Sequence, residues 1–377
     1  MKPQRGYPLP IPLMKKIIRR WDDVKFLPPT ALTGLIRWHN SDNVVSAQQS
    51  DLPAGDFTSS FGGYSPYVNG GTATNPILTL DAGELKVDLM GTYVQSGFTT
   101  GVRMIAGAVY TLSFDLRGLN PSVMNIYLGA GSMNLDIPGI PVTTTKTRFT
   151  QIFTATTTSN GSIFLRTSDP MSTNPTLWFD NVSLTVATVS QLTDLSGGNN
   201  HLTQSSPSLR PKLVSLTSAS RPLLNNQKAI VFEGSMTSTL ALNAEHTHFF
   251  VYSGRTGDQG SLYSTSGFNK PIQRNSNFWA NENLVSGGLT GNFNASNLAV
   301  FTMDYTAGTY KVHLNNVLQP ALVIASALPT GNFVVGIRAG DGNLSAGIYE
   351  IISYSRILTD FERQQVYGWL KNKYNLA

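Results

Sequence analysis

Short runs of alternating apolar and polar residues, separated by turn-forming residues, constrain this chain more than any other feature of its sequence. In YTLSFDL, Tyr110, Leu112, Phe114 and Leu116 fall on one face of a strand, because successive side chains of a strand point to opposite sides. Similar runs recur from ELKVDL to GIYEIISYS, with Gly, Asn, Pro and Thr between them. We therefore expect an all-β protein built from antiparallel β-sandwiches.

The composition agrees with this fold class. Only 13% of the 377 residues are charged, which is about half the usual share, and the length is sufficient for two or three domains. There is no cysteine, so neither disulfides nor a thiolate metal site can contribute.

One helix is expected, at the C-terminal end of the sequence. Residues 359–362, TDFE, form a capping box, in which the Thr and Glu side chains each bond the other residue's backbone N–H. Val366, Trp369, Leu370 and Tyr374 then recur on one helical face. This pattern predicts an amphipathic helix packed on the outside of a sandwich.

The C-terminal part resembles the concanavalin A-like (laminin-G-like) jelly rolls of lectins and glucanases. The resemblance rests on DLSGGNNHLTQ (194–204), RPKLV (210–214), AIVFEGS (229–235) and, above all, GIYEIISYSRILTDFERQQVYGWLKNKYNL (347–376). In such domains an opening strand of the type W-x-x-S-D precedes the V-S-x-x-x-D-x-S-G segment by a short loop. Here LIRWHNSD (35–42) is that opening strand, and VSQLTDLSGG begins only at Val189.

The intervening part resembles the jelly-roll carbohydrate-binding modules found beside xylanases and cellulases. LPAGDFTSSFGGY (52–64), GELKVDLMG and TLWFDNVSLTV (176–186) carry this resemblance. Two nested jelly rolls are therefore expected, because the adjacent termini of a sandwich allow it to sit in a loop of another. The predicted divisions are an arm (1–30), a discontinuous lectin-like domain (31–44 and 188–377) and an inserted module (45–187).

The resemblance to carbohydrate-binding modules also points to Asp180, since the acid of this last strand commonly helps to hold a structural calcium in them. Calcium needs six to eight oxygen ligands, and one carboxylate supplies at most two. A calcium site and a simple turn cap both remain open for Asp180.

The N-terminal arm carries the net charge. Residues 1–26 hold seven basic and two acidic side chains, which give +5, while the remaining 20 basic and 20 acidic residues cancel. Such an arm suits an acidic protein surface, nucleic acid or a membrane face, although a solvated, disordered tail has the same composition. The candidate anchoring residues are Lys15, Lys16, Arg19, Arg20 and Trp21.

Sugar binding requires flat aromatic faces for stacking and amides or carboxylates for the hydroxyl groups. A polar stretch of the outer domain, NSNFWANEN, and several Gly/Asn-rich stretches of the insert offer these groups in loops, although aromatics that pack a loop would look the same. The candidates are Asn277, Phe278, Trp279, Asn281, Tyr64, Tyr67 and Tyr93.

The sequence gives little support for a catalytic site. The glucanase relatives carry their acids as E-x-D-x-x-E, whereas Glu84, Lys86 and Asp88 break this pattern with a lysine. His246 and His248 would lie on one strand face, either as metal ligands or, as we expect, as polar groups on a solvated face. We predict a protein without enzymatic activity and without a certain cofactor.

These features favour a bacteriophage virion protein, either capsid decoration, head fibre or tail-associated, whose glycan-binding domains serve adhesion. The expected partners are other virion proteins, host or environmental glycans and a second copy of the chain. We see no secretory signal pattern and no apolar run that could span a membrane. A bacterial surface or secreted glycan-binding protein is the alternative, and a purely architectural role also remains open.

Overall fold

The computed structural model describes most of the chain from residue 26 onward. The described residues are 26–53, 55–68, 75–89, 96–130, 133–156, 158–167, 176–215, 228–232, 234–241, 245–253, 259–265, 268–275, 277–279, 298–306, 309–318, 322–323, 332–336, 347–374 and 376. The candidate anchoring residues, Lys15, Lys16, Arg19, Arg20 and Trp21, lie outside them.

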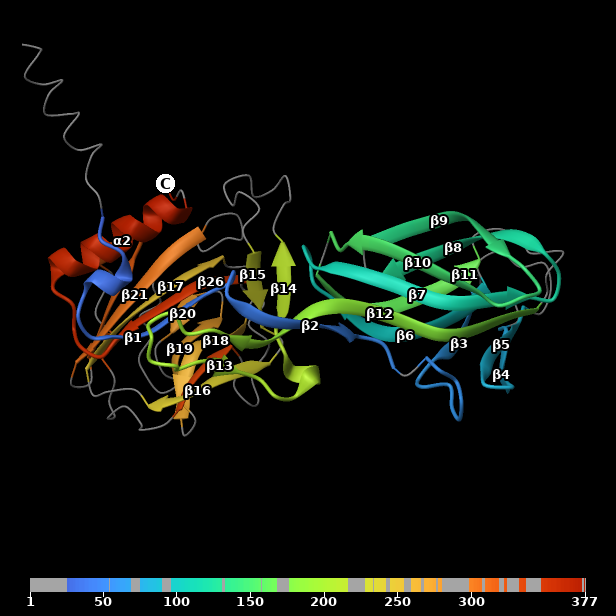
Figure 1. Ribbon diagram of the computed structural model, residues 1–377, viewed down its shortest axis with the longest axis horizontal. Helices are drawn as coiled ribbons and strands as arrows, with labels where there is room; N and C mark the ends of the chain where they lie inside the picture. The colour runs from blue at the N-terminus through green and yellow to red at the C-terminus, as the bar shows by residue number, and fades with distance from the viewer. Residues whose placement is uncertain are drawn as a thin grey trace, which may run out of the picture.

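The fold is all-β with a single described α-helix near the C-terminus, as the alternation predicts, and Figure 1 shows two lobes side by side. The first, here called the insert lobe, is a sandwich of two antiparallel sheets. One sheet has the order β3-β6-β11-β8-β9, and pairings give the other the order β4-β5-β12-β7-β10. The strands are β3 (Ser65–Val68), β4 (Ile77–Asp81), β5 (Glu84–Asp88), β6 (Ser96–Met104), β7 (Val109–Gly118), β8 (Ser122–Ala130), β9 (Met133–Val142), β10 (Thr147–Thr154), β11 (Ser159–Thr167) and β12 (Thr176–Leu192).

The insert lobe is held together by an apolar layer between its sheets. Phe98 and Leu165 of the first sheet and Phe114 and Phe179 of the second are each at most 3% exposed. The ring of Phe98 meets that of Phe179 edge-on, with centroids 4.9 Å apart. Alternation along each strand therefore leaves the opposite side of each sheet free to carry polar residues.

The second lobe, here called the frame lobe, is also a sandwich. One sheet runs β22-β21-β17-β26, with β1 and β15 both paired to the far side of β26, and the other runs β13-β16-β25-β18-β19-β20. Its elements are β1 (Leu35–Asn40), β13 (Leu202–Thr203), β14 (Lys212–Ser215), β15 (Lys228–Val231), β16 (Ser235–Ala241), β17 (His246–Ser253), β18 (Gln259–Thr265), β19 (Phe268–Asn275), β20 (Asn277–Trp279), β21 (Leu298–Thr306), β22 (Thr309–Leu314), β23 (Val317–Leu318), β24 (Leu322–Val323), β25 (Asn332–Gly336), β26 (Gly347–Tyr354), α2 (Asp360–Tyr374) and the 3-10 turns η1 (Pro29–Ala31) and η2 (Pro207–Leu209).

The interrupted strand β1 has two neighbours that are distant in sequence. On one side it pairs with β26, with Trp38 opposite Ile352. On the other, Leu195 N–H donates to Trp38 O at 2.7 Å, and Trp38 N–H donates to Asp194 Oδ1 at 3.0 Å. Residues 194 and 195 thus lie beside β1, although Asp194 follows Trp38 by 156 positions in the sequence.

The two lobes are connected by a two-stranded ribbon. Strand β2 (Val44–Ser50) runs antiparallel to the C-terminal half of β12, from Val44 opposite Leu192 to Ser50 opposite Thr185. Strand β12 extends without a break through 17 residues, pairing with insert strands at one end and with β13 and β14 at the other. The sequence-based division near Thr188 therefore falls inside a continuous strand (Figure 1).

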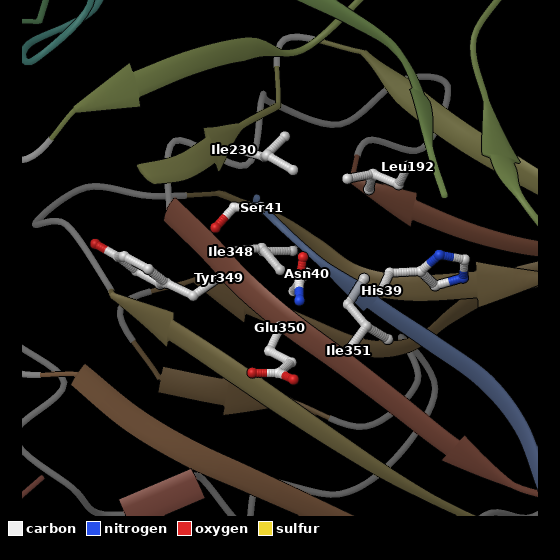
Figure 2. Close-up of a pocket in the computed structure, with 9 residues that line it drawn as sticks. All are labelled: His39, Asn40, Ser41, Leu192, Ile230, Ile348, Tyr349, Glu350 and Ile351. Atoms are coloured by element: carbon white, nitrogen blue, oxygen red, sulfur yellow. The ribbon is translucent and has the colours of Figure 1, made fainter. Parts of the chain in front are cut away.

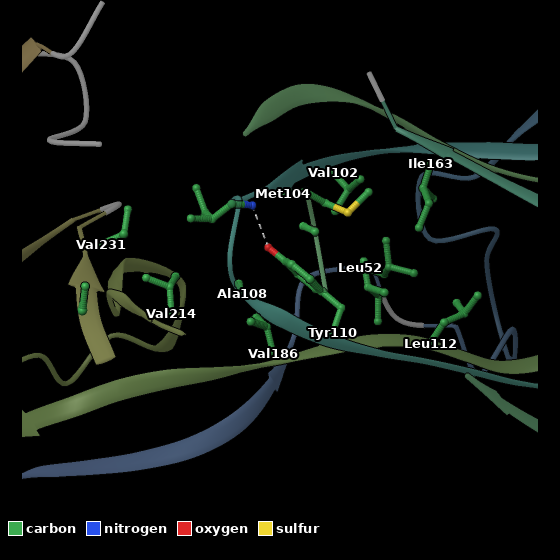
Figure 3. Packing of buried hydrophobic residues seen from close by; sticks show 14 of the residues in the cluster. Leu52, Val102, Met104, Ala108, Tyr110, Leu112, Ile163, Val186, Val214 and Val231 are labelled. Atoms are coloured by element: carbon green, nitrogen blue, oxygen red, sulfur yellow. Dashed lines mark hydrogen bonds between the residues drawn. The ribbon is translucent and has the colours of Figure 1, made fainter. Parts of the chain in front are cut away.

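Apolar and ionic contacts also join the lobes. Figure 3 shows Val214 and Val231 of the frame lobe near Ala108 and Val186 of the insert lobe, and all four belong to one buried cluster. Next to them the Lys212 ammonium, with its side chain 3% exposed, pairs with Asp51 at 2.6 Å and donates to Arg103 O at 3.2 Å. The lobes thus share a buried interface in addition to the ribbon.

Helix α2 confirms the predicted capping box and amphipathic face. Thr359 N–H donates to Glu362 Oε2 at 2.9 Å, and Glu362 N–H donates to Thr359 Oγ1 at 3.3 Å. Val366, Leu370 and Tyr374 are buried against the sheet of β17 and β26, and α2 covers the outer side of that sheet (Figure 1). In the part of the chain that the structure describes, no helix combines the length and apolar character needed to cross a membrane.

The prediction that His246 and His248 lie on a solvated strand face is wrong, since both are 0% exposed. Strand β17 is central in its sheet, between β21 and β26, so it has no free edge. One face lies under α2, and the other, with the two imidazoles, faces β25, where the rings of His248 and Phe333 are 5.5 Å apart. Alternation in a short sequence cannot show that both faces of a strand are covered.

Candidate functional site

The outer face of the β3-β6-β11-β8-β9 sheet gathers the residues best suited to bind a ligand. Strand register places Tyr67, Gly97, Arg166, Tyr127 and Asp136 in one row that crosses all five strands. Tyr67 and Tyr127 are half-buried and Asp136 is exposed. Because neighbours in a row point to the same side of a sheet, two phenol rings, a guanidinium and a carboxylate share one surface.

A second row of the same face lies two residues along each strand. It runs through Ser65, Thr99, Phe164, Gly129 and Asn134. Phe164 is half-buried, and its partners on either side are a threonine and a glycine. Phe164 is therefore the one aromatic residue of this row, and a threonine and a glycine flank it.

The absence of a side chain at Gly97 shapes the face. A Cβ at this position would meet the backbone of Leu165 and Arg166 on the neighbouring strand, so the close approach of β6 to β11 requires glycine. Above the glycine, the Tyr67 and Phe164 rings approach to 4.4 Å between centroids, at a tilt of 48°. Two aromatic residues of different strands thus form one continuous apolar platform.

Arg166 lies at the centre of the first row. Its guanidinium carbon is 4.0 Å from the centroid of the Tyr127 ring and 5.8 Å from that of the Tyr67 ring. The residue is 8% exposed, and within the described chain its Nε and Nη1 atoms have no hydrogen-bond partner. Cation–π attraction to the two rings holds the guanidinium in place, while Nε and Nη1 stay without a hydrogen-bond partner in the described chain.

This arrangement can bind a planar-faced polar ligand. Tyrosine and phenylalanine rings stack on the C–H faces of a sugar ring, while a guanidinium and a carboxylate supply a fork of donors and a pair of acceptors. Asp136 is the one carboxylate in the two rows. Glycoside hydrolysis uses two such groups around the bond that is cleaved, and these two rows present one.

The structure places the predicted aromatic residues of the insert differently. Tyr67 belongs to the face, whereas Tyr93 lies outside the described residues. The expected exposure of Tyr64 is wrong: it is 4% exposed, and its ring packs edge-on against Phe57 and Phe98. Burial raises the pKa of its phenol. A Gly-rich neighbourhood suggested a loop tip, but the loop folds its tyrosine into the core.

The predicted cluster in the frame lobe is not in a loop, contrary to expectation. Asn277, Phe278 and Trp279 form β20, which pairs with β19 at the end of its sheet, with Trp279 opposite Gln273. Asn281 lies outside the described residues. These residues belong to a different lobe from Tyr67, so the structure does not bring the two sets of candidates into one site.

Asp180 has a structural role at a bulge of β12. Its Oδ1 atom accepts a hydrogen bond from the N–H of Asn181, a residue with φ of 48°, and its Oδ2 atom pairs with the Lys146 ammonium at 2.8 Å. In the described residues no group of three or more acidic or histidine side chains could hold a metal ion. The same ammonium pairs with Glu84 at 3.0 Å, so Lys146 already supplies the positive charge between these two carboxylates, where calcium would need six to eight oxygen ligands.

The frame lobe contains a small pocket of about 150 Å³ beside β1 and β26 (Figure 2). Glu350 at its edge accepts hydrogen bonds from Trp38 Nε1 (2.5 Å), Lys373 Nζ (2.8 Å) and Tyr374 Oη (2.7 Å). Burial lowers the pKa of His39, another lining residue, to about 4. That volume includes space open to solvent, and no enclosed room for a water molecule remains between these residues, so Glu350 and its partners form a structural network.

The insert lobe has a second small pocket, of about 190 Å³, at the end of its core. Leu89, Leu165, Leu177 and Phe179 line it together with Arg166. That volume includes space open to solvent, and no enclosed room for a water molecule remains between these residues.

No protein-family model and no curated protein matches the sequence. Among solved structures, the chain is similar to a carbohydrate-binding module, CBM4 (22% identity, 33% of this chain and 94% of that one, TM-score 0.28). It is also similar to the second N-terminal cellulose-binding domain of Cellulomonas fimi β-1,4-glucanase C (22%, 38% and 97%, 0.30).

A further similarity is to a structure of botulinum neurotoxin type C, whose cell entry depends on interaction with two ganglioside molecules (12% identity, 48% of each chain, TM-score 0.35). At these identities and scores the likenesses concern the fold, so the site stands on its own geometry.

Four residues of the face, Phe164, Arg166, Tyr127 and Asp136, were missed by the sequence analysis. The signal that could have found them is the alternation within SIFLRT, where Ile163 and Leu165 point into the core and the intervening residues point outward. Tyr127 needs the strand register as well, because its position opposite Arg166 depends on pairing between β8 and β11.

Proposed function

We propose that this chain is a glycan-binding protein without enzymatic activity, which binds through the outer face of the β3-β6-β11-β8-β9 sheet. The observation that carries the proposal is the row Tyr67–Gly97–Arg166–Tyr127–Asp136, with Phe164 beside it. Aromatic rings, a guanidinium and a carboxylate share one face of the sheet, and this is the combination that sugars require. A row five strands wide can contact several sugar units of a chain.

The first experiment measures binding of the full chain to an array of immobilised glycans. Tyr127→Ala should reduce binding about tenfold or more, since loss of a stacking ring removes its contact area from the ligand. Ile152→Ala is the matched control, because Ile152 is 62% exposed on the opposite sheet, in β10. Loss of binding in the control, or full binding by Tyr127→Ala, would contradict a site on this face.

Trp279→Ala tests the frame-lobe candidates in the same assay. If the cluster of β20 binds glycan, this substitution should abolish binding and leave the melting temperature unchanged. If Tyr127→Ala alone abolishes binding, the site lies in the insert lobe. A large fall in melting temperature for Trp279→Ala would instead identify a packing role.

We further propose that a bacteriophage particle carries the protein and that the basic N-terminal arm anchors it to other virion proteins. The support is the charge pattern, since residues 1–26 account for the whole net charge of +5. Multiple copies on a particle would make weak single-site glycan binding effective through avidity. A location on a bacterial surface or in secreted material is the alternative.

Mass spectrometry of purified particles and of the culture supernatant tests this location. Presence in virions at a fixed ratio to the capsid or tail proteins supports the arm as an anchor. Truncation should stop at residue 25, because Phe26 packs on Gly368 of α2 and Leu27 N–H donates to Gln365. Normal incorporation of the truncated chain would contradict the anchoring role.

We also infer that residues 45–187 form a domain inserted into a second one made of residues 31–44 and 188–377. The support is that β1 pairs with β26 and contacts the 193–195 segment, while Phe98, Leu165, Phe114 and Phe179 form an apolar layer between the two sheets of the insert lobe. Residues 45–187 expressed alone should unfold cooperatively on heating. A polypeptide that stays unfolded would show that the frame lobe is needed.

A further inference from the structure

Arg166 differs from the other arginines of the insert lobe whose contacts are known. Arg117 pairs with Glu84 at 2.5 Å, and Arg148 pairs with Asp115 at 3.1 Å. Arg166, by contrast, pairs with no carboxylate of the described residues, although it is 8% exposed. A guanidinium that is desolvated without an anionic partner is unfavourable for folding, because it loses hydration and gains little in return.

Arg37 of the frame lobe is also a buried arginine with side-chain atoms that have no hydrogen-bond partner in the described chain. The two arginines differ in whether a ligand can reach them. Arg37 is 0% exposed inside the sandwich, stacks on Phe333 at 4.6 Å and donates through Nη2 to Leu240 O. A ligand cannot reach it without opening the lobe. Arg166 lies on the outer side of its sheet, in the middle of the proposed binding row.

We propose that Arg166 makes this site specific for acidic glycans, by binding the carboxylate of a sugar acid such as a uronate. This inference rests on the proposed function, since it assigns a ligand class to the same face. The guanidinium offers parallel N–H donors, which fit the two oxygens of a planar carboxylate. Tyr67 and Tyr127, at 5.8 and 4.0 Å, flank the group that would bind the carboxylate and can stack on the attached sugar rings.

Asp136 supports this orientation of the ligand. It stands in the same row as Arg166 with Tyr127 between them, so the row presents a positive group at its centre and a negative group near one edge. A carboxylate is attracted to the centre of the row and repelled from that edge, whereas sugar hydroxyls can donate to Asp136. The arrangement therefore fixes where along the row the acidic sugar lies.

The test compares one polymer in two chemical forms. Polygalacturonate and polyglucuronate are each measured against the full chain, beside the same polymers after reduction of their carboxylates to primary alcohols. The wild-type chain should bind the acidic forms about tenfold to a hundredfold more tightly, as expected for a charge-assisted bidentate pair. Arg166→Met, which retains the volume of the side chain, should lose this preference and retain binding to the reduced forms.

Two further variants keep the outcomes distinct. Arg166→Lys should recover part of the preference, since it keeps the charge but not the paired donors. Arg117→Met should leave it unchanged, because Arg117 serves Glu84 on the other sheet. A melting curve of Arg166→Met checks the fold, and Arg166→Lys remains informative if the methionine variant does not fold.

Equal binding of the acidic and reduced polymers by the wild-type chain would overturn the inference and leave glycan binding intact. Binding of sulfated but not carboxylated polysaccharides would also overturn it. Failure to bind any neutral or acidic polysaccharide would overturn the proposed function itself. Retention of the acid preference by Arg166→Met would assign the preference to another residue.

Discussion

The interiors of the two lobes are built from different chemistry. Between the sheets of the insert lobe lie Phe98, Phe114 and Leu165, each at most 1% exposed. Between the sheets of the frame lobe lie Arg37 and His248, both 0% exposed, close to Phe333. The insert lobe has an apolar layer between its sheets, whereas the frame lobe encloses charged and polar side chains beside apolar ones such as Phe250 and Val335.

This difference explains where the candidate function lies. When the core between two sheets is apolar, the outer face of a sheet does not have to contribute to it. In the insert lobe, one outer face carries the row of aromatic and polar residues. In the frame lobe, α2 covers the outer side of one sheet, and inside the sandwich His248 Nδ1 and Ser353 Oγ are hydrogen-bonded at 2.8 Å. Buried polar groups in such a network are structural by default.

The largest expected effect comes from a substitution in the apolar layer of the insert lobe. Phe114→Ala should lower the free energy of unfolding of the insert lobe by about 4 kcal/mol, because the cavity adds to the lost burial. Phe114 is 0% exposed and its ring meets those of Phe149 and Phe179. Urea unfolding measures the change, with the exposed Ile152→Ala as control. A cost below about 1 kcal/mol would mean that the core is not tightly packed.

The next effect concerns the junction of the lobes. Lys212→Met leaves Asp51, whose side chain is 15% exposed, without its ammonium partner, and Asp51→Asn leaves the lysine charge buried. Each should cost about 3 kcal/mol, since removal of one member of a buried pair leaves an uncompensated charge. The double variant should cost less than the sum of the two, as a urea double-mutant cycle would show. Additive costs would mean that the two groups are not coupled.

Acid should destabilise the frame lobe more than the insert lobe, which contains no histidine. Burial, with Arg37 and His201 nearby, lowers the pKa of His39 to about 4, although Asp194 acts in the opposite direction. A histidine with a lowered pKa contributes stability above its ordinary pKa near 6.5, and this contribution is lost as pH falls toward 4.

The expected loss between about pH 7 and pH 4.5 is roughly 2 kcal/mol for His39, from urea unfolding at both pH values. His39→Gln keeps a donor for Thr193 O but cannot titrate, so its stability should change less over this range. An equal pH dependence in the variant would exclude His39 as the source.

The smallest effect concerns helix α2. Thr359→Ala removes the side-chain partner of Glu362 N–H and should cost about 1 kcal/mol of frame-lobe stability. Thr359→Ser retains the hydroxyl and should restore most of it. Thermal unfolding of both variants measures the difference, and equal melting temperatures would show that the cap contributes little.

Local sequence was sufficient for the elements whose signals are short in range. The alternation of YTLSFDL predicts β7, and its four apolar residues are all buried, at 0–1% exposure. The capping box and the apolar face of α2 were predicted residue by residue. Both depend on contacts within a few positions, so the sequence contains the information directly.

The candidate site depended on contacts between distant segments. Tyr67 and Arg166 are about a hundred positions apart and lie in one row because β6 pairs with both their strands. Tyr64, only three residues from Tyr67, turns into the core instead.

The sequence by itself determined the fold class, the helix and the concentration of charge in residues 1–26, because strand alternation, capping and charge are local properties. Only the tertiary structure decided that both faces of β17 are covered, that β12 joins the lobes as one strand, and that Arg166 lies between two tyrosines. Register and layer packing fix these features, and they arise from long-range hydrogen bonds and burial that no short segment specifies.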